Sequence, residues 1–317
     1  MKKFRYLFLI LCLMFFASGV LAKTLTVESG KQVYDDSKKL ITLEDNVNVT
    51  IDDINIRSPR AFLTINANGK PDTATFTDGA KAIQITKNSK SETKASILKL
   101  SLLTKEVEAT GDVQSTIEKL GKPTITLKSN YQSFDAKTNI MDAKENVILL
   151  YDDIKATSNS AKIWISKTGG LDFLKLIGNA KIIQDKVEIV AKEVHLNAKT
   201  EEMTAVGSAY TNVKIDDTDT VKIWAANQQY NNKTNTAIAS GNTKIIYNDY
   251  VATGPKAVME ANPKTKKPNK IMFSGRSKIN DGGKSITADK ITITMNPKNF
   301  TAEGNVKTQI DDIGDVK

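Results

Sequence analysis

A five-residue pattern recurs along this chain at a nearly constant interval. In its clear form, as in Ala109-Thr110-Gly111-Asp112-Val113, glycine and a short polar residue stand between small or β-branched residues. Nine copies have their fourth residues at positions 46, 79, 112, 146, 179, 208, 242, 276 and 305, the second copy being weaker. The steps between them are 29, 33 or 34 residues. A period of this length is typical of folds that stack one short unit many times.

The residues between these pentads alternate between apolar and polar. Val47, Val49 and Ile51 alternate with Asn48 and Thr50, and later units repeat this period of two. Such alternation predicts half-buried β-strands. We therefore expect each unit of about 33 residues to be strand, turn, strand, turn, strand, with the pentad between cycles. Glycine in the pentad permits a positive φ or a β-bulge where the chain changes direction.

Units of this kind cannot bury their apolar faces alone, so they must stack. The prediction is an all-β fold, an elongated open β-jellyroll or β-solenoid of about nine repeats, forming one continuous domain over residues 23–317. In a closed solenoid the apolar stripe is a dry core. In a rolled sheet that is open along one side it lines a trough. Composition alone does not choose between these two arrangements.

The N-terminus predicts export. Three basic residues precede an apolar run that ends in Val20-Leu21-Ala22, which indicates a signal peptide over residues 1–22 that is cleaved before Lys23. The alternative is an uncleaved membrane anchor, because the apolar run is just long enough to span a bilayer. The only cysteine is Cys12, so the mature chain would have neither a disulfide nor a thiolate metal site. A location outside the cytoplasm follows from either alternative.

The charges do not point to nucleic acid. The chain has 45 basic and 36 acidic residues, a net charge of +9 at pH 7, and the basic residues are thinly spread. A diffuse positive charge suits an anionic partner without identifying one. Neither a dense basic stripe nor a nucleic-acid-binding motif is present.

A search for catalytic residues finds few candidates. His195 is the only histidine, and it belongs to an alternating strand in which we expect it to lie at the surface. Trp164 and Trp224 occupy different offsets within their units, which favours local packing over a carbohydrate-stacking ladder. Acid pairs recur after the pentads, where short polar side chains favour turns, and neighbouring acids lack the opposed geometry of glycosidases. These pairs are Asp52-Asp53, Asp152-Asp153, Asp216-Asp217 and Asp311-Asp312. No enzyme activity, cofactor or metal is predicted.

The motifs resemble a known family. The mature chain opens with Leu25-Thr26-Val27 and continues through Leu43-Glu44-Asp45-Asn46-Val47 to Arg60-Ala61-Phe62-Leu63. This pattern resembles the OstA-like family of lipopolysaccharide transport proteins, which includes LptA. The resemblance covers the whole mature chain through the repeat. Some pentads depart from the family's Gly-Asn-Val, for example Gly207-Ser208-Ala209 and Gly275-Arg276-Ser277.

The resemblance implies a function. Family members are periplasmic open β-jellyrolls whose apolar interior shields lipid acyl chains while copies join edge to edge, without chemistry. The implied ligand is lipopolysaccharide or a related glycolipid, and the implied partners are further copies of the chain and components like LptC and LptD. Alternation places one set of apolar side chains on the inner face as the expected lipid-binding residues. They are Leu25, Val27, Val47, Val49, Ile51, Ile54, Ile56, Leu63 and Ile65.

Three alternatives remain at this point. A surface β-solenoid, such as an adhesin or a structural filament, would have a closed dry core and no lipid. A component like LptC would keep the N-terminal segment as an anchor. An enzyme acting on polysaccharide is the third. Neither end of the repeat carries a helix, a proline cluster or a dense charge run that would cap it, so we expect open strand edges that pair head to tail.

Overall fold

The computed structural model describes residues 25–51, 53–87, 89–104, 106–121, 123–135, 137–165, 171–215, 220–264, 268–295 and 297–310. The predicted signal peptide over residues 1–22 and its cleavage site before Lys23 lie outside these ranges. Within them, no helix has the length and hydrophobicity needed to cross a membrane.

Every regular element in the described ranges is a β-strand, as predicted. The chain divides into two compact units between Leu176 and Ile177. The first unit contains β1 (Leu25–Glu28), β2 (Lys31–Asp35), β3 (Leu40–Ile51), β4 (Ile54–Ile65), β5 (Pro71–Thr77), β6 (Ala80–Ile85), β7 (Ser89–Ala95), β8 (Ile97–Ser101), β9 (Glu106–Lys119), β10 (Ile125–Asp135), β11 (Ile140–Tyr151) and β12 (Ile154–Ile165). β13 (Leu171–Gln184) contains the division itself. The second unit continues with β14 (Val187–Asn197), β15 (Glu202–Lys214), β16 (Thr220–Asn231), β17 (Thr236–Tyr247), β18 (Tyr250–Ala261), β19 (Pro268–Asp281), β20 (Lys284–Met295), β21 (Lys298–Glu303) and β22 (Lys307–Ile310).

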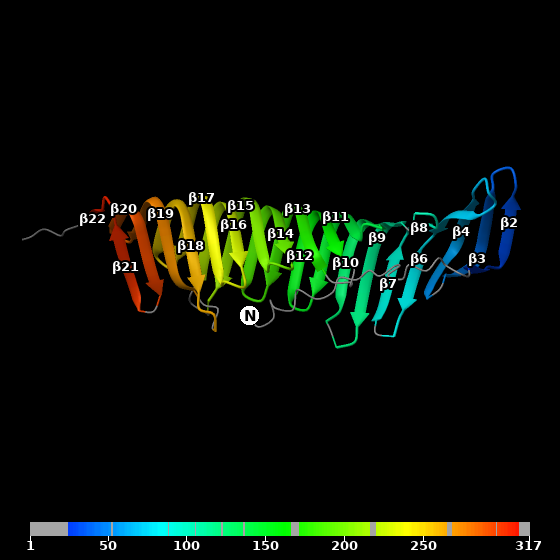
Figure 1. Ribbon diagram of the computed structural model, residues 1–317, viewed down its shortest axis with the longest axis horizontal. Coiled ribbons are helices and arrows are strands. Elements are labelled where there is room, and N and C mark those ends of the chain that lie inside the picture. Colours follow the sequence, from blue (N-terminus) through cyan, green and yellow to red (C-terminus); the bar gives the residue numbers. More distant parts are fainter. Residues whose placement is uncertain are drawn as a thin grey trace, which may run out of the picture. The chain divides into compact units, whose positions relative to one another are not determined.

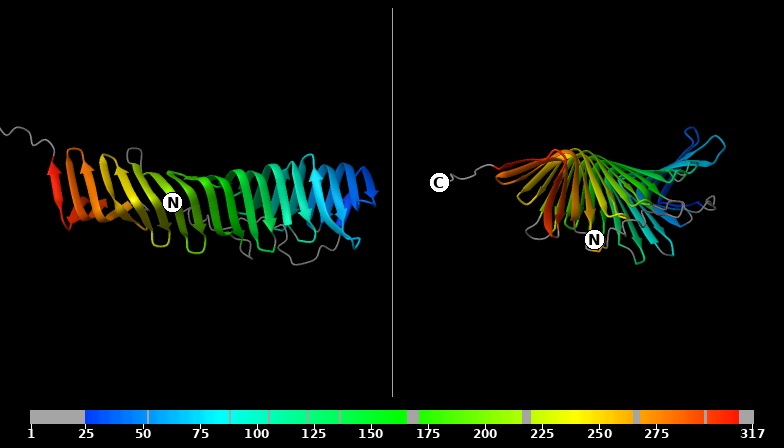
Figure 2. Two further views of the ribbon diagram at one scale, coloured as in Figure 1. Left: turned by 90° about the horizontal axis from the view of Figure 1, so that it is seen from above. Right: turned by 60° about the vertical axis from the view of Figure 1, so that its left-hand side comes forward.

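Within each unit the strands follow one another in sequence order (Figures 1 and 2). Long strands pair antiparallel with the strand before and the strand after, as β10 does with β9 and β11 and β17 does with β16 and β18. In the first unit, β4 pairs with the two short strands β5 and β6, and β9 pairs with β7 and β8. This succession of antiparallel strands confirms the predicted stacked β-fold.

The pentads bend the strands. In all nine copies the third residue has a positive φ, and in eight the fourth residue has one too, as Asp45 and Asn46 do at 65° and 56°. Two such residues on β3 oppose the single residue Pro59 on β4, since Glu44 pairs with Arg60 and Val47 with Ser58. Two residues opposite one define a β-bulge. The predicted bulge and change of direction are therefore confirmed, but most pentads lie inside a long strand rather than between strands.

The strands that lie between pentad strands bend through a different motif. At each bend the residue that pairs with the fifth pentad position, or stands at the equivalent place, is small and faces inward. These residues are Ser58, Ala95, Ser129, Ser158, Ala191, Ala225, Gly254 and Ala288. Space at the inner side of the bend is tight: a Cβ added at Gly254 would lie 2.4 Å from the hydroxyl oxygen of Ser277. Small side chains let the strand fold at this point.

The bends divide each unit into two walls. Wall 1 comprises the half-strands that precede a pentad, together with the half-strands that pair with them. Wall 2 comprises the half-strands that follow a pentad, together with the half-strands that pair with those. In β3, for example, residues 40–44 belong to wall 1 and residues 47–51 to wall 2. Alternate side chains of both walls face the space between them, which we call the interior. In every pairing found among the described residues, a half-strand pairs only within its own wall. No described backbone ladder therefore closes the side opposite the bends.

Candidate functional site

The nine side chains predicted to bind lipid all lie on the inward-facing side of their strands. Six of them are buried, namely Val47, Val49, Ile51, Ile54, Ile56 and Leu63. Leu25, Val27 and Ile65 are half-buried. Leu25 and Ile65 lie at the ends of their half-strands, away from the bends, and Val27 lies on β1, which among the described residues pairs only with β3. A molecule entering the interior would meet these half-buried residues first.

Strand pairing aligns most of these residues in rows on wall 2. Val27 of β1 pairs with Val49 of β3, and Val49 pairs with Ile56 of β4. Leu25, Ile51 and Ile54 form a second row nearer the strand ends. Cross-strand neighbours on one face lie within contact distance of each other. The first strands of the unit thus present a continuous apolar surface to the interior.

The structure adds wall 1 residues that the sequence-based set omitted. Leu43, Ala61 and Phe76 are buried and inward, and they align through the register of β3, β4 and β5. Leu63 and Ile65 belong to the same wall. The signal was available, since these residues continue the alternation on the other side of each pentad. Once the pentad is placed inside the strand, both halves contribute to one interior.

Polar side chains link the two walls close to the bends. In the first unit, the Ser115 hydroxyl on wall 2 donates to Gln132 Oε1 on wall 1 at 2.7 Å, and Gln132 Nε2 donates to the Leu127 carbonyl at 3.2 Å. Thr93 extends this network through a 3.0 Å contact with Ser115. All three side chains are buried, so each polar group is satisfied by another protein group, as burial requires.

The second unit repeats this arrangement at the equivalent positions. Thr211 donates to Gln228 Oε1 at 2.5 Å, and Gln228 Nε2 donates to the carbonyls of Ala209 and Ile223 at 3.0 and 3.1 Å. We call these two networks the glutamine clamps. Sequence reasoning missed them, because a glutamine on an alternating strand gives no sign that its partner lies on the opposite wall.

The second unit has its own apolar interior. A buried cluster includes Ile223, Ile245, Phe273 and Ile291 from both walls. Partly buried side chains also pack against this cluster, and among them Tyr247, Tyr250 and Met295 lie at strand ends. The full set is Val213, Ile215, Tyr247, Tyr250, Met259, Ile286, Met295, Phe300 and Ala302. The interior of this unit is therefore lined by aliphatic side chains at depth and by several aromatic and methionine side chains toward the open side.

The other residues considered from the sequence lie on the outer faces. His195 points away from the interior, and its Nε2 lies 3.0 Å from Glu193 Oε2, which agrees with a surface strand. Trp164 packs edge-on against Phe173, and Trp224 packs against Tyr210, each with ring centroids 5.1 Å apart. Both tryptophans are thus engaged in local outer-face packing.

Asp152-Asp153, the acid pair that lies wholly within the described ranges, forms a turn, as predicted. Asp152 and Asp153 connect β11 to β12, and Asp152 has a φ of 51°. Asp53 lies in the turn after β3 and accepts a hydrogen bond from Gln84 Nε2 at 3.0 Å. Asp52, Asp216-Asp217 and Asp311-Asp312 lie outside the described residues. Among the residues described, no three histidine, cysteine or acidic side chains gather in a way that could hold a metal ion.

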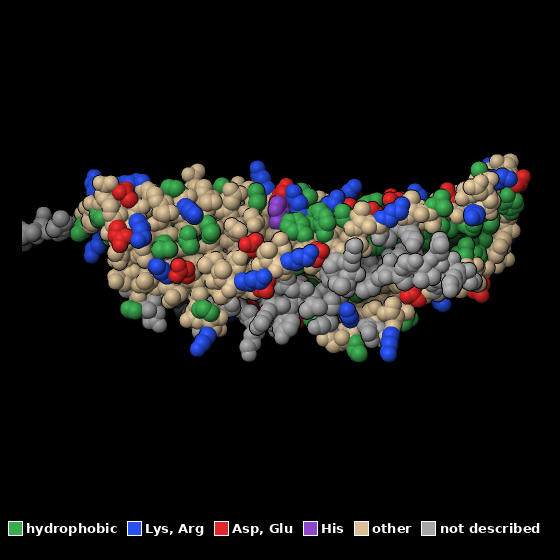
Figure 3. Space-filling model, viewed as in Figure 1, with side chains coloured by type: hydrophobic (Ala, Val, Ile, Leu, Met, Phe, Trp, Pro, Cys, Tyr) green, Lys and Arg blue, Asp and Glu red, His purple; other side chains and the backbone are tan. Residues whose placement is uncertain are grey.

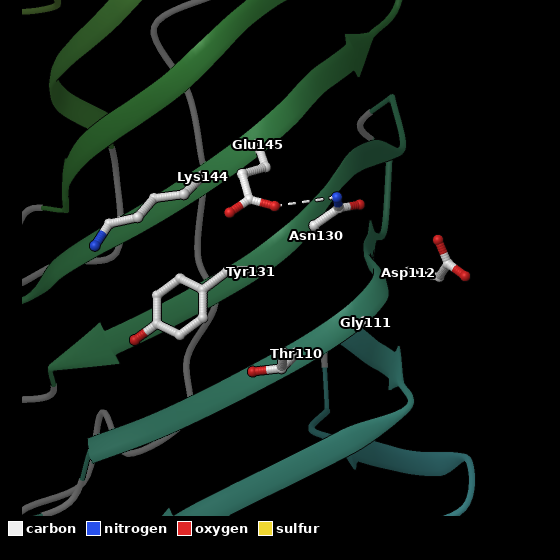
Figure 4. Close-up of a pocket in the computed structure, with 7 residues that line it drawn as sticks. All are labelled: Thr110, Gly111, Asp112, Asn130, Tyr131, Lys144 and Glu145. Carbon is white, nitrogen blue, oxygen red and sulfur yellow. Dashed lines mark hydrogen bonds between the residues drawn. The ribbon is translucent and has the colours of Figure 1, made fainter.

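A polar pocket of about 510 Å³ lies over the bends of β9, β10 and β11. Its lining residues are Thr110, Gly111, Asp112, Asn130, Tyr131, Lys144 and Glu145 (Figure 4). The Lys144 ammonium lies 5.3 Å from the centre of the Tyr131 ring, and Asn130 Nδ2 donates to Glu145 Oε2 at 3.2 Å. Four of its seven lining residues therefore interact in pairs. On the visible face of the molecule, basic and acidic side chains are interspersed (Figure 3).

Comparison with known proteins identifies a family. A family model described as LptA/(LptD N-terminal domain) LPS transport protein matches residues 26–167. This segment is similar to the LptA/LptD N-terminal family. The match covers nearly all of β1 and every strand from β2 to β12, with the first four pentads, and it confirms the predicted resemblance. The five remaining pentads continue the same pattern beyond the matched family segment.

A solved structure also aligns with part of this chain. The crystal structure of LptH, the LptA-homologous periplasmic component of the lipopolysaccharide transport device from Pseudomonas aeruginosa, shares 14% sequence identity with this chain at a TM-score of 0.36. The alignment covers 42% of this chain and 97% of LptH. A search of curated proteins finds no match.

Proposed function

We propose that this chain is a periplasmic, non-enzymatic carrier or bridge that holds the acyl chains of lipopolysaccharide, or a related glycolipid, between its two walls. The supporting observation is the combination of a family segment at residues 26–167 with an interior lined by apolar side chains. Within the described strands, the side opposite the bends has no backbone ladder to close it. Lipid chains would enter there while the sugar head stays in water.

The physical basis of binding is burial of hydrocarbon. Each CH₂ group removed from water contributes about 0.8 kcal/mol, so a long acyl chain can bind without a polar contact. The half-buried residues Leu25, Val27 and Ile65 border the interior, and the fully buried side chains behind them form its base. In this proposal the chain is exported by a signal peptide that is cleaved before Lys23.

Photo-crosslinking in cells tests this proposal. A photoreactive amino acid at Val27 or Ile65 is expected to capture lipopolysaccharide, because both side chains face the interior and are only half-buried. The same group at Thr26 or Asn48, which have the opposite phase, is expected to capture none. Equal labelling of both faces, or no lipid at any position, would contradict an acyl-binding interior and favour a closed structural solenoid.

The strand edges support a bridge made of several copies. Among the described residues, β2 pairs only with β3, and β22 pairs only with β20. Both carry exposed apolar side chains, namely Val33 and Tyr34 on β2 and Ile310 on β22. A strand with one unpaired side can accept a strand from another chain. We infer that the C-terminal edge of one copy, which includes β22, pairs wall to wall with the N-terminal edge of the next, which includes β2, or with a related transport component.

A further inference from the structure

Two aromatic side chains meet across the open side of the second unit. Tyr250 is the first residue of β18 and belongs to wall 2, where β18 pairs with β17. Phe300 lies on β21 and pairs with the buried Ile293 of wall 1. Their ring centroids are 5.2 Å apart, and the ring planes differ by 33°. Side chains from opposite walls are thus in direct contact.

The depth of this contact distinguishes it from the glutamine clamp. Gln228 lies just after the bend of β16, so the clamp lies at the closed side of the interior. Tyr250 lies at the end of its half-strand, where β17 turns into β18, so its contact with Phe300 lies toward the open side. Both rings are only partly buried and pack on the apolar cluster beneath them. The aromatic pair therefore covers part of the interior.

Other side chains that pack against the same apolar cluster suit a flexible hydrocarbon. Met259 and Met295 come from wall 1, and Tyr247 and Ile286 come from wall 2. Methionine fills irregular apolar space because its unbranched chain adapts to its neighbours. An aromatic pair is a weak contact compared with the strand ladders that carry it. The rings can therefore separate while the walls keep their backbone pairing.

We propose that Tyr250 and Phe300 form an aromatic gate over the interior of the second unit, and that an acyl chain must displace it to enter or leave. This inference rests on the proposed lipid-carrier function. It extends that function to a part of the chain that lies beyond the matched family segment. It also assigns control of the rate at which an acyl chain enters or leaves to the contact between these two residues.

Time-resolved photolabelling tests the gate. The full chain is mixed with a sixteen-carbon fatty acid carrying a diazirine, irradiated at increasing times, and mapped by peptide mass spectrometry. In Tyr250→Ala and Phe300→Ala, we expect interior peptides of the second unit to be labelled several-fold faster than in wild type. Labelling of first-unit peptides should keep its wild-type rate and serves as the internal control.

A matched variant controls for the loss of an aromatic contact. Tyr210→Ala removes a ring pair of similar separation, 5.1 Å from Trp224, on the outer face, and it should leave the labelling rates unchanged. If Tyr210→Ala accelerates labelling as much as the gate variants do, the effect comes from general loosening and the gate is overturned. Wild-type rates in Tyr250→Ala and Phe300→Ala would also overturn it.

A reversible crosslink across the gate tests the same point by closing and reopening it in one variant. In a Cys12→Ser background, the variant with Tyr250→Cys and Phe300→Cys has two thiols, which a short cleavable bis-maleimide can join. Joining them should slow labelling of the second unit, and cleaving the linker should restore it. An unchanged rate would overturn the gate while leaving the carrier function intact. Absence of labelling in both units of wild type would overturn the proposed function and the gate with it.

Discussion

Single residues hold the two walls of each unit at a fixed separation. Gln132 and Gln228 each use one amide to accept from a hydroxyl on the opposite wall and to donate to a carbonyl there. An amide suits this role because it is both donor and acceptor. A leucine of similar size could occupy the same space, but the hydroxyl and carbonyl groups would then lose their partner.

The first residue-scale prediction compares two adjacent glutamines. Gln228→Leu should lower the free energy of unfolding by about 1–3 kcal/mol, since the buried-side partners Thr211, Ala209 and Ile223 would lose hydrogen bonds. Gln229→Leu, on the exposed outer face of the same strand, should change it by less than about 0.5 kcal/mol. Urea denaturation measures both. Equal midpoints for the two variants would mean that the clamp contributes nothing.

At this scale the sequence predicts which side chains face inward but not what they touch across the interior. Strict alternation identified Val27, Val49 and Ile56 because a strand allows only two side-chain directions. The partner of Gln132 depends instead on the angle at which two half-strands meet. That angle is set jointly by several bends, and no short sequence window contains it.

At the scale of the strand, the bend is the element that organises the fold. The pentad supplies two consecutive left-handed residues, a conformation that glycine adopts freely and that asparagine and aspartate tolerate better than other residues. The opposing strand supplies one small inward residue. Each bend thus needs two different sequence signals on neighbouring strands.

The second prediction separates two possible reasons for glycine in a bend: its positive φ, and the lack of space for a Cβ next to the neighbouring strand. Gly241 and Gly282 both have positive φ values, 79° and 56°. A Cβ at Gly241 would lie 2.7 Å from the Cβ of Ala226, whereas one at Gly282 would meet nothing within 4 Å. Gly282→Ala should therefore cost about 1–2 kcal/mol for its backbone alone. Gly241→Ala should cost a further ~1–3 kcal/mol for overpacking.

Chemical denaturation of the two glycine variants provides the measurement. Equal destabilisation would show that the neighbouring strand yields without cost and that only the backbone conformation matters.

The pentad half of the bend could be predicted from its glycine and its spacing. The other half could not, because Ser129 or Ala225 resembles any small residue on an alternating strand. Only the register, which pairs Ser129 with Val113 and Ala225 with Ala209, shows why these positions must be small.

At the scale of the whole chain, the repeated unit was predictable and the division into two compact units was not. The pentad continues at similar spacing on both sides of Leu176, and no composition change marks the boundary. The sequence also predicted strand edges without caps. The structure identifies candidate edges as β2 and β22, strands with apolar side chains exposed and one paired side among the described residues.

The last prediction tests whether these edges join copies of the chain. Lysine on an edge strand discourages pairing, because burying its charge against another chain is costly. Val33→Lys and Ile310→Lys should each shift the protein toward monomer in light scattering at rising concentration. Leu103→Lys provides the control, since Leu103 lies in a turn and is 59% exposed, compared with 47% for Val33 and 49% for Ile310. Added charge alone would affect all three variants alike.

Head-to-tail pairing makes a further prediction, because each edge variant loses only one of its two edges. Mixing Val33→Lys with Ile310→Lys should therefore allow dimers to form through the edge that remains intact in each. If wild type is monomeric at every concentration, or if the control disperses it equally, the chain does not assemble through β2 and β22.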